Sequence, residues 1–180
     1  SSDVCSSDLE VPQGVELTLT GTLAASEIVV TGAGTVICSA ANTLQGTVKG
    51  DDTITVQYSA LPAETALFND SGWEGVVWLK NATIAAFKAN LGNANSVIRF
   101  TGCSGYPFYG DTTTKVYEID STIDLRDDGD TKAFTTSDGY GGYRAIFKAL
   151  TGSGTFVSNL SSSHYYIFKD ASEFAGTIAL

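Results

Sequence analysis

The densest group of side chains that could do chemistry is a run of four aspartates: Asp124, Asp127, Asp128 and Asp130. Carboxylate oxygens are the ligands that hard cations prefer, so this run is a candidate Ca²⁺ site. Its spacing does not match the EF-hand loop, because the third position counted from Asp124 is Arg126 and the twelfth is Thr135. The alternative is a solvated turn after a strand at 122–125. Beyond calcium, the sequence indicates no cofactor.

The same carboxylates could also cleave polysaccharides. Glycoside hydrolysis needs two acids held at a fixed separation, and Arg126 and Lys132 lie close to the aspartates in the chain. Ser104 does not complete a nucleophile elbow, because Tyr106 stands where the second glycine belongs. We therefore assign no catalytic residue and expect a non-enzymatic protein, with a polysaccharide-degrading enzyme as an alternative.

A second group of candidates is aromatic. Tyr106 and Tyr109 flank Pro107 closely, and Tyr140 and Tyr143 flank a pair of glycines. An exposed Tyr or Trp offers a flat apolar face with a polar tip, which suits sugar stacking or protein contacts. The alternative is that these rings cap the core under long loops.

The elements that must position these side chains are short β-strands. Strands are expected where β-branched and aromatic residues run between Gly, Asn and Asp clusters, at 15–20, 27–31, 53–58, 75–79, 96–100, 115–119 and 143–147. The segment 82–90 carries helix-forming Ala and Lys, but we interpret it as an extra strand. The chain is predicted to be all-β.

A short glycine-containing motif recurs along the chain. Its copies lie at 30–36, 48–54 and 150–156. A second half also recurs, at 44–48, 73–77 and 174–178. Such self-similarity indicates stacked units that share one core. Strand-turn-strand units with variable loops favour a right-handed parallel β-helix, or β-solenoid, and an antiparallel β-sandwich is the alternative. Scarce hairpin signals favour the solenoid.

Alignment of the copies predicts which side chains face the core. The second residue after each aligned glycine is aliphatic, and strand side chains alternate between faces, so Val77 should be buried and Trp78 should face outward. Trp73 aligns with Leu44 and Phe174, which are large and apolar, so it is interpreted as core filler. Trp78 is therefore the aromatic binding candidate whose outward orientation the repeats predict.

Composition narrows the class of protein. The chain has 180 residues, 43% hydrophobic and 17% charged, with a net charge of −10, which favours one folded domain. The lysines and arginines are scattered, which argues against nucleic acid and anionic membranes as partners. No apolar run is long enough to span a bilayer. Cys38 and Cys103 could form a disulfide or remain free thiols.

The two ends of the chain differ from its middle. Residues 1–9 resemble the conceptual translation of a short-read sequencing adapter, of the kind found on genes from environmental DNA, and we set them aside as non-native. Residues 10–180 are then a single β-solenoid domain. The last residues read as the middle of a strand with no polar cap, so we expect a fragment truncated at both ends, whose neighbours are flanking repeats of the same chain.

The runs at 150–156 and 168–178, with a degenerate copy at 68–75, carry a family resemblance. The chain resembles surface proteins built as parallel β-helices, including autotransporter-associated β-strand repeat proteins and adhesin-like proteins. This resemblance implies a scaffold without catalytic groups, exported to the outer cell surface or the extracellular space for display or adhesion. Partners would be glycans or surface proteins.

Two questions stay open at this point. The copies are unevenly spaced, and 81–149 holds no clear copy, so this stretch is either an inserted loop region or a set of diverged coils. A carbohydrate-binding module that uses Trp78 or the tyrosines is the main alternative function.

Overall fold

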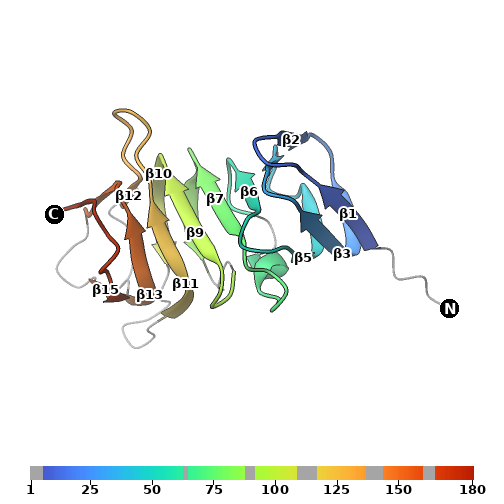
Figure 1. The fold of residues 1–180 in the computed structure, drawn as a ribbon. Helices are drawn as coiled ribbons and strands as arrows, with labels where there is room; N and C mark the ends of the chain where they lie inside the picture. Colours follow the sequence, from blue (N-terminus) through green and yellow to red (C-terminus); the bar gives the residue numbers. More distant parts are fainter. Residues whose placement is uncertain (1–5, 63–64, 88–91, 109–116, 137–143, 160–164) are drawn as a thin grey trace.

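The computed structural model shows an elongated stack of parallel strands (Figure 1) and describes residues 6–62, 65–87, 92–108, 117–136, 144–159 and 165–180. All pairings between its named strands are parallel. The chain is therefore an all-β parallel β-solenoid, which confirms the predicted fold class. The antiparallel sandwich is wrong, because a sandwich is built from antiparallel strand pairs and every pairing between the described strands is parallel.

The strands are β1 (Ser6–Glu10), β2 (Glu16–Leu19), β3 (Leu23–Thr31), β4 (Thr35–Cys38), β5 (Leu44–Lys49), β6 (Thr55–Tyr58), β7 (Val76–Lys80), β8 (Thr83–Phe87), β9 (Val97–Thr101), β10 (Cys103–Phe108), β11 (Tyr117–Leu125), β12 (Phe134–Thr136), β13 (Arg144–Gly152), β14 (Thr155–Val157), β15 (Tyr165–Asp170) and β16 (Thr177–Ala179). A 3₁₀ helix, η1, spans Thr65–Phe68. The segment 82–90, expected as an extra strand, contains β8. Residues 6–9, set aside above, belong to β1, which pairs with β3.

The strands form three sheets that run along the stack. The largest has eight strands in the order β15-β13-β11-β9-β7-β6-β4-β2, the second has five in the order β16-β14-β12-β10-β8, and the third has three in the order β1-β3-β5. Figure 1 shows the eight-stranded sheet following the chain from blue to red. Its register pairs Thr35 with Thr55, Thr55 with Val76, and Val76 with Val97, so one coil takes roughly 20 residues, a period typical of solenoids.

The core is built from side chains that stack in register from coil to coil. One ladder in the eight-stranded sheet consists of Val36, Val56, Val77, Ile98, Ile123 and Leu150, all of them buried. Burying each such aliphatic side chain stabilises the fold by about 1.5–3 kcal/mol relative to leaving it exposed. Val77 is in the core and Trp78 is on the opposite face, as the repeats predicted. Trp73 is fully buried, so its interpretation as core filler is also confirmed.

The repeated glycine motif marks corners between sheets. Gly50 forms a parallel bridge with Trp73, and Gly152 forms one with Phe174, so in these two copies the motif and the second half that follows it occupy the same corner on successive coils. The copies at 30–36 and 48–54 turn from the three-stranded into the eight-stranded sheet, whereas the copy at 150–156 turns from the eight-stranded into the five-stranded sheet. The three copies therefore stand at two different corners.

The stretch from 81 to 149 continues the same stack. It holds β8 to β12 and most of β13, which pair with their neighbours in the two larger sheets. The interpretation as diverged coils is therefore correct for its described residues. Cys103, within this stretch, and Cys38 are both buried and free, so they do not pair.

Candidate functional site

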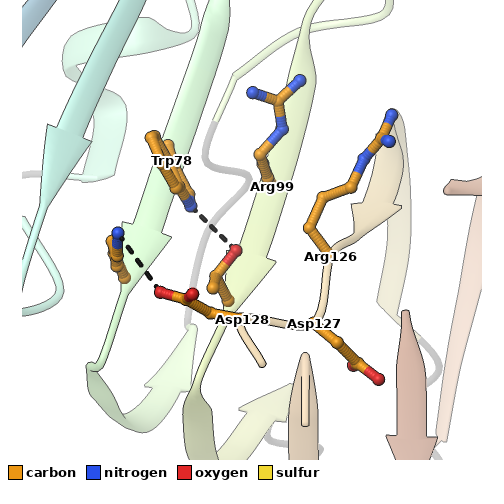
Figure 2. Close-up of a pocket in the computed structure, with 7 residues that line it drawn as sticks. Trp78, Arg99, Arg126, Asp127 and Asp128 are labelled. Carbon is orange, nitrogen blue, oxygen red and sulfur yellow. Dashed lines mark hydrogen bonds and ion pairs between the residues drawn. The ribbon is translucent and has the colours of Figure 1, made fainter. Parts of the chain in front are cut away.

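A groove with a volume of about 490 Å³ lies on the outer face of the eight-stranded sheet (Figure 2). Its lining residues are Trp78, Lys80, Arg99, Thr101, Arg126, Asp127 and Asp128. Most come from the neighbouring strands β7 and β9, and the rest from the turn after β11. The groove combines an indole ring, cations and carboxylates on one surface.

The parallel register brings these side chains together. Trp78 is paired with Arg99 across β7 and β9, and Lys80 is paired with Thr101 two residues farther along. Arg99 is in turn paired with Asp124 of β11. Each of these positions alternates with a core residue, which directs its side chain to the outer face.

Asp124 is the centre of an ion-pair cluster beneath the groove. Its Oδ2 accepts a hydrogen bond from Arg99 Nε at 2.7 Å, and its Oδ1 accepts one from Arg126 Nε at 2.8 Å. The Asp124 side chain is only 4% exposed. A buried carboxylate is costly unless it is paired and hydrogen-bonded, and here both oxygens are satisfied. Taken by itself, this cluster of two guanidinium groups and one carboxylate carries one net positive charge.

Trp78 is held in a fixed orientation on the outer face. Its Nε1 donates a hydrogen bond to Thr101 Oγ1 at 3.0 Å, and the ring is half-buried. Lys80 Nζ lies 5.0 Å from the ring centroid and Arg99 Cζ lies 5.8 Å from it, within the range of cation–π attraction. The outward orientation predicted from the repeats is confirmed, and a binding role for Trp78 stays a prediction.

Asp127 connects two coils. Its Oδ1 accepts hydrogen bonds from the backbone amides of Ala133 and Thr155, each at 2.7 Å, and its Oδ2 accepts one from Thr155 Oγ1 at 2.8 Å. Burial alone would raise the pKa of Asp127, but these hydrogen bonds and the charge of Lys132 hold it below its ordinary value. Asp127 therefore fastens the turn after β11 to the next coil as a carboxylate.

The other two aspartates of the run are exposed. Asp128 Oδ2 lies 3.5 Å from Lys80 Nζ, and its side chain is 62% exposed. Asp130 is on the surface of the same turn. The described part of the chain contains no group of three or more His, Cys, Asp or Glu side chains placed to hold a metal ion. Asp124 and Asp127 are instead engaged by protein groups, and the calcium site stays a prediction.

One of the four tyrosine candidates lies within the described residues. Tyr106 belongs to β10 and is paired with Ala85 of β8, in the five-stranded sheet. Tyr109, Tyr140 and Tyr143 lie outside the residues that the structure describes. Their proposed contact with sugars or proteins stays a prediction.

Three lining residues were not identified from the sequence: Lys80, Arg99 and Thr101. A usable signal was present, because Gln57, Trp78 and Arg99 stand one coil apart and are paired in register. Extending that period from Trp78 would have placed Arg99 beside it. The copies of the glycine motif did not reveal this coil period, because they stand at two different corners of the solenoid.

Comparison of the chain with protein-family models, curated proteins and solved structures finds no match. In the part of the chain that the structure describes, no helix is long and apolar enough to cross a membrane. The shape of the coil stack and the chemistry of the groove are therefore the basis for a proposed function.

Proposed function

We propose that this chain is a non-enzymatic segment of a secreted or cell-surface repeat protein, whose stacked coils hold an extended surface for adhesion or interaction. The observation that carries the proposal is the contrast between the two faces of the eight-stranded sheet. The inward ladder is uniformly aliphatic, whereas the outward ladder changes chemistry at every coil: Ile37, Gln57, Trp78, Arg99, Asp124 and Thr151. A repeated core with a varied outer surface suits a scaffold that presents binding groups.

The state of the carboxylates favours binding over catalysis. Both oxygens of Asp124 are taken by guanidinium groups, and Asp127 is taken by hydrogen bonds to the next coil. A general acid needs a carboxyl pKa raised toward neutrality, whereas the pKa of Asp127 is lowered. The two other aspartates of the run, Asp128 and Asp130, are exposed, and Asp128 is paired with Lys80.

Location outside the cell is supported by the resemblance of the glycine motifs to those of β-helical surface proteins. In the described structure these motifs lie at corners of a parallel solenoid, where they act as scaffold. A second candidate function, glycan binding, is favoured by one observation: Trp78 lies on the outer face among three cationic side chains.

The proposal is tested with beads coated with the purified chain. Adhesion is measured to mucin, to plant and bacterial polysaccharides and to cultured cells, with beads carrying the heat-unfolded chain as the control. We expect adhesion to at least one surface that the unfolded control does not show, without release of reducing ends from any polysaccharide. Polysaccharide turnover, or no difference from the unfolded control on any surface, would contradict the proposal.

A further inference from the structure

We propose that the groove over β7 and β9 binds an acidic glycan, with the carboxylate of a uronic acid held by Arg99 and Arg126 and the sugar ring against Trp78. This inference rests on the proposed role as an interaction surface and names the ligand class for one part of it. It follows from the arrangement of three kinds of groups in one groove.

The first is the pair of guanidinium groups. Each donates its Nε hydrogen to Asp124, so its terminal amino groups are left for a ligand, and both residues line the groove. Because Asp124 fixes both side chains, they need little further ordering when an anion binds. The planar fork of a guanidinium group matches a carboxylate in a bidentate geometry. The net positive charge within the Arg99–Arg126–Asp124 cluster favours one negative charge at this end of the groove, away from Asp127 and Asp128.

The second is the polarity of the groove. Figure 2 shows the guanidinium groups of Arg99 and Arg126 toward the top of the view and the carboxylates of Asp127 and Asp128 toward the bottom. A uronic acid carries a carboxylate on one side of its ring and hydroxyl groups on the other. The carboxylate of Asp128, whose side chain is exposed, can accept hydrogen bonds from these hydroxyls.

The third is the indole ring of Trp78. Its hydrogen bond to Thr101 fixes the ring, and an aromatic face suits stacking of the apolar face of a sugar. Lys80 Nζ lies over this ring, but its ion pair with the exposed Asp128 is long, at 3.5 Å, so the ammonium group can move aside at little cost. That movement leaves Asp128 open to sugar hydroxyls.

The charges of the groove argue against nucleic acid or other polyphosphates. Lys80, Arg99 and Arg126 are accompanied by Asp127 and Asp128 in the lining, with Asp124 directly below. A polyphosphate would meet these carboxylates in a chain whose net charge is already −10. A glycan with one carboxylate per sugar places less charge in the groove and supplies hydroxyls for the aspartates.

The experiment is affinity electrophoresis of the chain in gels that contain polygalacturonate, its carboxyl-reduced form, or dextran sulfate. The variants are W78A and R126Q, with K169Q as a control that removes one exposed cation, paired with Glu118, away from the groove. Thermal unfolding by circular dichroism establishes that each variant is folded. Arg126 is chosen over Arg99 because its side chain is more exposed, at 52% against 28%.

We expect retardation by polygalacturonate, a loss of about tenfold or more in affinity in W78A and in R126Q, as for interfacial Trp and Arg anchors, and no change in K169Q. Equal retardation by the carboxyl-reduced polymer, preference for dextran sulfate, or full affinity in R126Q would overturn the proposal. If the gels contradict acidic-glycan binding while the wild-type chain still adheres in the bead assay, only the groove assignment fails. If the wild-type chain adheres to nothing, the proposed function fails as well.

Discussion

Arg99 and Asp124 are register partners on neighbouring parallel strands, 25 residues apart in the chain, and their side chains form a hydrogen-bonded ion pair at 2.7 Å. The carboxylate lies at the outer face of β11 yet is almost fully buried, because Arg99 and Arg126 cover it. This pair connects the stability of the coil stack with the chemistry of the groove. It is therefore the natural place to perturb both.

Replacing Arg99 by Ala should destabilise the fold more than replacing Arg126 by Ala. Removing one partner of a buried ion pair leaves an uncompensated charge, and we expect a loss of about 2–3 kcal/mol for R99A, with Arg126 still present. Arg126 is half-exposed, so its loss should cost about 1 kcal/mol. Urea unfolding of both variants measures the two losses in free energy of unfolding. A larger loss for R126A would contradict the role of Arg99 as the main partner of the buried Asp124 carboxylate.

The Asp127 carboxylate should stabilise the junction between coils in a pH-dependent way. Its pKa is below the ordinary value of about 3.9, so its contribution is fully present above that pH and is lost as the pH falls through the folded-state pKa. At pH 7 we expect D127N to be less stable than the wild type by about 1–2 kcal/mol, through its weakened charge-assisted hydrogen bonds.

Urea unfolding of wild type and D127N at pH 7 and at pH 3 tests this expectation. The difference between the two proteins should shrink at the lower pH, because the wild-type carboxyl then begins to bind a proton. D130N, on the exposed part of the same turn, is the control and should match the wild type at both pH values. A difference that stays constant across the two pH values would contradict a role for the ionised carboxylate.

A methyl group at Gly152 should break the corner between β13 and β14. This glycine has a φ of +92°, and an added Cβ would lie 2.2 Å from the carbonyl oxygen of Leu125 on the previous coil. G152A combines backbone strain with a clash against backbone, and we expect a loss of about 2–4 kcal/mol. Gly21 has open space around it, so G21A should change the free energy of unfolding by less than about 0.5 kcal/mol.

The two described cysteines should be unreactive in the folded chain. Burial raises the pKa of the Cys38 thiol to about 11, an effect that the nearby Tyr58 hydroxyl offsets only in part, and burial also raises the pKa of Cys103. In a C5S variant, a thiol reagent at pH 8 should react slowly until the chain is unfolded in urea. Rapid labelling of the folded variant would show that these parts of the core open readily.

Much of the fold was predictable because local signals agreed with the global architecture. Alternation in the strand at 75–79 separated buried Val77 from outward Trp78 without any knowledge of their neighbours. Trp73 was recognised as core because it aligned with Leu44, which is also buried. These properties depend on residues close in sequence, where the strand period decides the side of the sheet.

The groove was harder to predict because it depends on register between coils. Trp78 bonds to Thr101 across 23 residues, and Arg99 bonds to Asp124 across 25 residues. A shift of one residue in either pairing would move these side chains to the other face. The run of aspartates was visible in the sequence. Which of them are engaged by protein groups depends on Arg99, which binds Asp124, and on Thr155, which binds Asp127, and both partners come from neighbouring coils.

The most direct single test is incubation of the purified chain with polygalacturonate, followed by two measurements on the same sample. The bound fraction of the polymer is measured by co-sedimentation with bead-immobilised chain, and the polymer length is measured by size-exclusion chromatography. We predict that the polymer is bound and that its length is unchanged after prolonged incubation. Shortened polymer would show an enzyme, and polymer recovered entirely free would show that the Trp78 groove is not an acidic-glycan site.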